Sequence, residues 1–102
     1  MGLFSKKYEL PTPPAIRGDR NAAELLRAWV AHGDLHVVLR HDAFGPDAGA
    51  WGVALVDLAR HVANAFQQSA GVDPQVVLER IRHVFDAEWA KPTDDPTGSV
   101  AQ

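Results

Sequence analysis

The sequence predicts an α+β fold in which an antiparallel β-hairpin is packed by two α-helices. Three observations support this fold class. Two runs of alternating apolar residues flank a turn at residues 32–34, a broad apolar helical surface covers Ala50–Phe66, and Asp73 opens a second amphipathic segment. The length of 102 residues predicts one domain.

Both ends of the chain are predicted to lie outside the folded domain, which we place at residues 21–91. Three of residues 11–14 are proline, which lacks a backbone donor and favours the polyproline II conformation. We therefore expect residues 1–20 to form an extended N-terminal arm. Residues 92–102 are polar and rich in turn-forming residues, so we expect a disordered C-terminal tail.

The hairpin is predicted from the alternation of apolar and other residues on both sides of His32-Gly33-Asp34. The apolar positions are Leu26, Ala28, Val30, Leu35, Val37 and Leu39. Before them, Asn21 and Glu24 have the spacing of a capping box, which predicts a short helical turn at Asn21–Leu25. The composition of residues 22–31 also permits a helix, so the choice between strand and helix for residues 21–31 stays open here.

Two helices are predicted after the hairpin. Asp47 is expected to cap the first turn of the central helix, and Gly71 is expected to end that helix in a left-handed conformation. Asp73 is the expected N-cap of the last helix, with Pro74 in its first turn. Pro92 ends the last helical segment. One face of that helix is apolar and consists of Val77, Leu78, Ile81, Val84, Phe85 and Trp89.

The central helix has more apolar surface than one hairpin and one helix can cover. We therefore predict a homodimer. Either the hairpins join into a four-stranded sheet, because an isolated two-stranded ribbon has open edges, or the central helices pack about a two-fold axis.

The charge and composition exclude several function classes. Ten basic and thirteen acidic residues give a net charge of −3 with no basic face, so we predict no nucleic-acid partner. No apolar run approaches the length of a membrane span, and the lysines near the N-terminus precede no apolar stretch of a secretory signal. The absence of cysteine fits a cytoplasmic protein.

Three segments together carry a family resemblance: LRAWVAHGDLHVVLR, AWGVALVDLARHVANAF and RIRHVFDAEWAKPTD. Over residues 24–95 the chain resembles a family of small, mostly alphaproteobacterial proteins known as a domain of unknown function. The pattern WG…LxDLARHVA is the most specific part of the match. The resemblance implies a stand-alone cytoplasmic protein with a hairpin before its helices, and it carries no activity or catalytic residue.

Two groups of polar residues are candidates for a catalytic or metal-binding site. Asp57 and His61 are four residues apart on one helix, a spacing that would let a carboxylate orient an imidazole base. No serine has the setting of a partner nucleophile, so a surface pair is preferred and no catalytic residue is assigned. His32, His36 and His41 cluster in sequence, but they match no tight metal-binding pattern, and we predict no metal site.

The tryptophans suggest where a ligand would bind if there is one. An aromatic pocket between the hairpin and the helices would be lined by Trp29, Trp51, Asp57, His61 and Glu88. Asp57 or Glu88 could accept an indole N–H. Glu88 lies within the apolar arc of the last helix, and it is expected either to reach solvent or to pair with an arginine of the hairpin.

The residues therefore favour a non-enzymatic homodimeric interaction or adaptor module, with a protein partner docking on the N-terminal arm. The alternative is a small-molecule-binding module that uses the aromatic pocket. A hydrolase-like enzyme using His61 is the third hypothesis. No cofactor is predicted.

Overall fold

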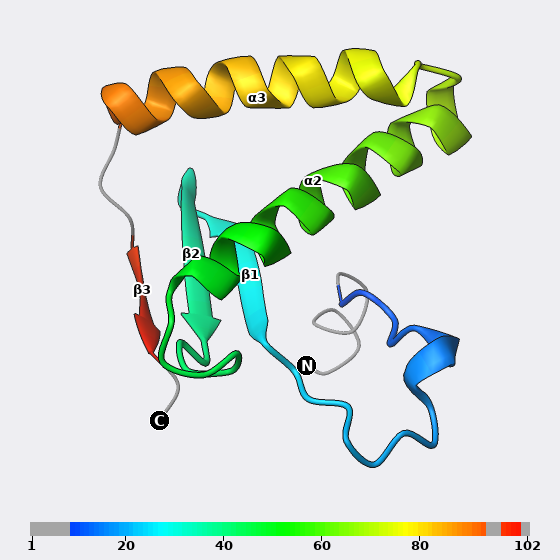
Figure 1. The fold of residues 1–102 in the computed structure, drawn as a ribbon, viewed down its shortest axis with the longest axis vertical. Coiled ribbons are helices and arrows are strands. Elements are labelled where there is room, and N and C mark those ends of the chain that lie inside the picture. Colours follow the sequence, from blue (N-terminus) through cyan, green and yellow to red (C-terminus); the bar gives the residue numbers. More distant parts are fainter. Residues whose placement is uncertain (1–8, 94–96, 101–102) are drawn as a thin grey trace.

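The computed structural model of this chain describes residues 9–93 and 97–100, and their elements form two groups (Figure 1). One group is a three-stranded sheet and the other is a pair of helices, which confirms the α+β class. The elements in chain order are η1 (Pro14–Ile16), β1 (Leu26–Ala31), β2 (Asp34–Leu39), α2 (Gly49–Ala70), α3 (Pro74–Ala90) and β3 (Thr97–Val100).

Strands β1 and β2 form the predicted antiparallel hairpin. Ala31 pairs with Asp34, so His32 and Gly33 alone make the turn. Both have positive φ, 53° and 78°, as the two central residues of a type I′ hairpin turn require. Glycine adopts this conformation without strain, which explains why the sequence places Gly33 there.

The short helical turn predicted at Asn21–Leu25 is wrong. Residues 22–25 have no helical structure, and the N–H of Arg40 donates to the carbonyl of Leu25 at 2.9 Å, which continues the hairpin pairing. The Glu24 carboxylate binds Arg27 instead of closing a capping box. Residues 26–31 are a strand because the cross-strand hydrogen bonds to β2 outweigh their helix-forming composition.

Strand β3 lies in the segment predicted to be a disordered tail. It pairs in parallel with β2 on the edge opposite β1, with Val37 aligned with Gly98 and Val38 with Ser99. The prediction of disorder does not hold for these four residues. Thr97 and Val100 favour strands, but Gly98 and Ser99 between them leave no alternating pattern. The open edge of β2 offers backbone donors and acceptors that any residue except proline can pair with.

The helix boundaries follow the predicted signals. Gly71 has a φ of 69°, and its N–H donates to the carbonyl of Gln67 at 2.9 Å, closing α2. The Asp73 carboxylate accepts the N–H of Gln75 at 2.9 Å and caps α3. Asp47 accepts the N–H of Gly49 at 2.9 Å, so it satisfies an amide at the start of α2 as predicted.

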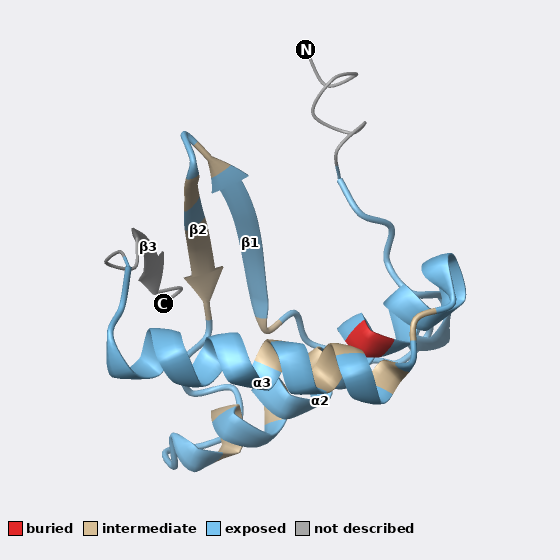
Figure 2. Cartoon of the chain, turned by 90° about the horizontal axis from the view of Figure 1, so that it is seen from above, coloured by how far each residue is buried: buried red, intermediate tan, exposed pale blue. Residues whose placement is uncertain are grey.

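The helices pair with each other and not with the sheet. Within the described residues, no α-carbon of either helix lies within 8 Å of an α-carbon of a strand. Figure 2 shows the strands rising from the layer of helices instead of lying against it. The helices were expected to cover one face of the hairpin, and within a single chain they leave it exposed, because residues 40–48 lead α2 away from the strands toward α3.

Burial is correspondingly sparse. Ala63 of α2 is the one buried residue of the described range 9–93, and α3 is the element that packs against α2 there (Figure 2). Neither described helix combines the length and the apolar character needed to cross a bilayer.

Candidate functional site

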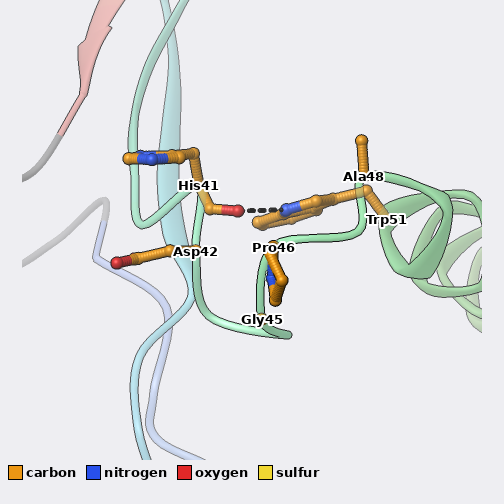
Figure 3. A pocket seen from close by; sticks show the side chains of 6 residues that line it. All are labelled: His41, Asp42, Gly45, Pro46, Ala48 and Trp51. Carbon is orange, nitrogen blue, oxygen red and sulfur yellow. Dashed lines mark hydrogen bonds between the residues drawn. The ribbon is translucent and has the colours of Figure 1, made fainter.

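A depression of about 670 Å³ lies where the loop after β2 meets the first turn of α2 (Figure 3). Its lining residues are His41, Asp42, Gly45, Pro46, Ala48 and Trp51. The indole N–H of Trp51 donates to the carbonyl of His41 at 2.8 Å. The ring of Phe44 meets the indole edge to face, with centroids 5.2 Å apart. Trp51 therefore anchors the loop to the helix.

Asp57 and Glu88 were considered as acceptors for an indole N–H, and neither accepts the N–H of Trp51. A backbone carbonyl only ten residues earlier in the chain satisfies the N–H without a charged group. The side chains of His41 and Asp42 extend away from Trp51 in Figure 3. The depression thus presents the aromatic face of Trp51, and the side chains of His41 and Asp42 do not point toward it.

A second depression, of about 320 Å³, lies on the hairpin near the ends of its strands that are remote from the turn. Trp29 lines it together with Glu24, Leu25, Leu26, Arg27, Val38, Leu39 and Arg40. The Arg27 guanidinium donates two hydrogen bonds to the Glu24 carboxylate, from Nε to Oε1 and from Nη2 to Oε2. This contact lowers the pKa of Glu24 and raises the pKa of Arg27, since it favours the charged form of each.

The predicted contact between Asp57 and His61 does not form. Asp57 instead faces Arg60, with Oδ1 and Nη1 3.8 Å apart, and both side chains are exposed. His61 is exposed as well. An exposed ion pair at this distance contributes little to stability. Asp57, Arg60 and His61 therefore belong to the solvated surface of α2.

Glu88 is exposed to solvent, which is the first of the two predicted alternatives, and it also has a structural role. Its Oε2 accepts the N–H of Thr93 at 3.0 Å and the Thr93 hydroxyl at 3.1 Å. The carboxylate therefore holds the turn that follows α3 and does not reach an arginine of the hairpin. Phe85 and Trp89 stack beside it, with centroids 5.7 Å apart.

The histidines do not assemble into a cluster. His32 lies in the hairpin turn, and His36 faces Trp29 across the strands, with its Nε2 3.0 Å from the carbonyl oxygen of Ala31. Within residues 9–93 and 97–100, no three His, Asp or Glu side chains are grouped so that they could hold a metal ion.

The five predicted ligand-binding residues thus lie in separate places. Trp29 lines the hairpin depression, and Trp51 lines the loop depression. Asp57 and His61 are on the exposed surface of α2, and Glu88 is at the end of α3. The loop residues around Phe44 were not predicted to belong to a site, although the run Phe44-Gly45-Pro46 before Trp51 was the available signal.

Two exposed apolar surfaces are the more extensive features. We call the first the hairpin face. Because residues paired across an antiparallel ladder share a face, the register places Leu26, Ala28, Val30, Leu35, Val37 and Leu39 together on it. All six are apolar; Leu26, Val30 and Leu35 are exposed, with Val30 at 81%, and Val37 and Leu39 are half-buried. The opposite face is mixed and carries Arg27, Trp29 and His36.

We call the second surface the α2 stripe. It consists of Leu55, Leu58, Val62 and Phe66, which recur at helical spacing. The exposed fractions of these four side chains lie between 37% and 54%. Ala63, buried at the contact with α3, lies about 100° around the helix from Val62, so α3 leaves this stripe open.

Comparisons with known proteins give a family and a fold. A family model described as "Domain of unknown function (DUF5076)" matches residues 9–93. A solved structure described as that of a "putative pyruvate dehydrogenase from the photosynthetic bacterium Rhodopseudomonas palustrus CGA009" is 36% identical, with a TM-score of 0.67. The match covers 92% of this chain and 95% of that one. No curated protein matches.

Proposed function

The chain belongs to the family described as Domain of unknown function (DUF5076), and on that premise we propose that it is a non-enzymatic interaction module that works as a homodimer. The observation that carries the proposal is the near absence of burial. Ala63 is the one buried residue of range 9–93, while most large apolar side chains there are exposed. Contiguous exposed apolar surface of this kind marks a protein–protein interface.

The surface area supports association. A compact monomer of 11.1 kDa has an accessible surface of about 5,700 Å², and its unfolded chain has about 16,000 Å². The single chain exposes 9132 Å². The chain is therefore less compact than a monomer of this mass, as expected of a protomer whose interface is open. The radius of gyration agrees: it is 15.8 Å, against about 13 Å for a compact domain of this length.

The N-terminal arm supports a further protein partner. Pro13 and Arg17 have the dihedral angles of polyproline II on either side of η1, and Leu10 is 87% exposed. Backbone hydrogen bonds fold residues 13–22 into turns, so the extended stretch before η1 is the part that could dock in a partner's groove with little loss of entropy. The arm therefore suits an adaptor role that leaves the apolar surfaces for self-association.

Oxidative decarboxylation of pyruvate, suggested by the description of the similar structure, finds no support in these residues. That chemistry relies on thiamine diphosphate as an electron sink. The described residues offer no cluster of metal-ligating side chains for a metal-bound diphosphate, and the depression at Trp51 has no basic side chain besides His41. The residues do not fit the cofactor.

One observation favours the small-molecule alternative. The depression at Trp51 has a volume within the usual range for ligand pockets, roughly 300–1,000 Å³. Native mass spectrometry of protein purified from its own host, without a metal-affinity tag, tests it. A retained mass that is lost in Trp51→Phe would favour this alternative over the interaction module.

Sedimentation analysis with a matched pair of variants tests the main proposal. We expect the wild-type chain to sediment at twice 11.1 kDa at micromolar concentration. Leu58→Asp places a charge in the α2 stripe and should weaken the dimer roughly 30-fold or more. Asn64→Asp adds the same charge on the opposite side of α2 and should leave the dimer intact. A well-folded wild-type monomer at this concentration would overturn the proposal.

A further inference from the structure

We infer that the hairpin face of one copy is covered by the α2 stripe of a second copy, and reciprocally. The inference rests on the proposed function, because it specifies which surfaces the two copies share. The exposed members that carry it are Leu26 and Val30 on the hairpin and Leu58 and Phe66 on the helix.

The first argument is the layer rule for folded domains. An apolar sheet face and an apolar helix stripe are stable when each buries the other. Within the described residues of one chain this does not happen, since no α-carbon of a helix approaches within 8 Å of a strand. The two surfaces that would ordinarily form one core are both present, and each has exposed apolar side chains and no buried one.

The second argument concerns what each dimer arrangement leaves uncovered. Joining the hairpins edge to edge through β1 would leave both apolar surfaces exposed. Packing hairpin face on hairpin face would leave the α2 stripe open, and packing stripe on stripe would leave the hairpin face open. Reciprocal packing of hairpin on helix covers both surfaces in both copies, and a two-fold axis closes the assembly.

The third argument is dimensional. The stripe runs from Leu55 to Phe66, which is about 17 Å along a helix at 1.5 Å per residue. The six-residue strands of the hairpin are about 20 Å long. The lengths match, so one α2 stripe can lie along one hairpin face.

The absence of cysteine from the chain makes the arrangement directly testable by site-specific cross-linking. Ala28→Cys lies in the middle of the hairpin face and Leu58→Cys in the middle of the stripe. The two single variants, differently tagged, are refolded together and treated with a short bismaleimide. We expect a covalent heterodimer from the mixture and no cross-link from either variant alone. Ala28→Cys mixed with Arg82→Cys is the matched control, and it should give none.

A chain with both substitutions shows whether the hairpin face contacts the α2 stripe of a second copy or the stripe of the same chain. We expect Ala28→Cys/Leu58→Cys to give a covalent dimer, whereas a cross-linked species of monomer mass would overturn the inference. Circular dichroism checks that each variant folds as the wild type does.

The remaining outcomes distinguish this inference from the proposed function. Self-cross-linking of Ala28→Cys would indicate hairpin-to-hairpin packing, and self-cross-linking of Leu58→Cys would indicate helix-to-helix packing. Either one overturns the inference and leaves the homodimer standing, as does a dimer that gives no cross-link in any mixture. A monomer in sedimentation together with no intermolecular cross-link overturns both.

Discussion

The hairpin and the helix pair differ in how far each buries its apolar side chains within one chain. Both are amphipathic, and both have their local backbone requirements met within the chain, by the Gly33 turn in one and by the Gly71 and Asp73 caps in the other. The helix pair also buries Ala63, whereas every residue of β1 and β2 is exposed or half-buried. The turns and helix caps are therefore formed even where the apolar side chains stay exposed. We propose that a second chain covers those side chains.

Among the predicted changes in the free energy of unfolding, the largest is expected from Ala63→Leu in the helix pair. The extra side-chain volume has no space at the α2–α3 contact, where Ala63 is 1% exposed, and overpacking of this kind costs about 1–3 kcal/mol. Chemical denaturation monitored by circular dichroism measures the loss. Ala87→Leu, at an exposed position of α3, is the control and should change the free energy of unfolding by about 0.5 kcal/mol or less. Equal effects from both variants would contradict a packed helix contact.

Two glycine substitutions, one in the hairpin and one in α2, should change the stability of the protein in opposite directions. Gly33→Ala forces a side chain into a turn with a φ of 78° and should destabilise the protein by about 1–2 kcal/mol. Gly52→Ala lies inside α2, where an added Cβ meets nothing within 4 Å, and should stabilise it by about 1 kcal/mol. Thermal unfolding of the two variants beside the wild type measures both effects. A stabilising Gly33→Ala would mean that the turn is not type I′.

The features predicted correctly from the sequence are those set by neighbouring residues. The Gly-containing turn of the hairpin, the helix end at Gly71 and the cap at Asp73 each follow from steric or hydrogen-bonding rules that act over a few positions. The helical turn at residues 21–25 was predicted by the same kind of rule and is wrong. There a hydrogen bond between Leu25 and Arg40, fifteen residues apart, overrides the local preference.

The features missed from the sequence depend on distant contacts. Strand β3 pairs with β2 across about sixty residues, and its four residues have no alternating pattern that predicts the pairing. The candidate pocket joined Trp29 to Trp51 on the assumption that the helices lie on the hairpin. Within one chain they do not, so the two indoles line separate depressions. Alternation along the strands did identify the apolar positions of the hairpin face, although the consequence for assembly needed the structure.

The smallest effect concerns the polar end of the hairpin, where Glu24 and Arg27 share two hydrogen bonds. Arg27 lowers the pKa of Glu24, so the folded state binds this proton less readily than the unfolded state does. The contact therefore stabilises the hairpin above the unfolded pKa of Glu24, and the contribution is lost as the pH falls through the lower folded pKa. Carboxyl chemical shifts in an NMR titration should place the midpoint of Glu24 below the ordinary glutamate value.

Arg27→Gln should return that midpoint toward the ordinary value, while Arg82→Gln, which removes the guanidinium paired with Asp86 on α3, should leave it unchanged. An unchanged Glu24 midpoint in Arg27→Gln would show that the ion pair is not formed in solution. Because both partners are exposed, the effect on stability is expected to be small even though the pKa shift is measurable. The polar end of the hairpin would then be ordered chiefly by the hydrogen bond between Arg40 and Leu25, which is a property of the ladder and not of charge.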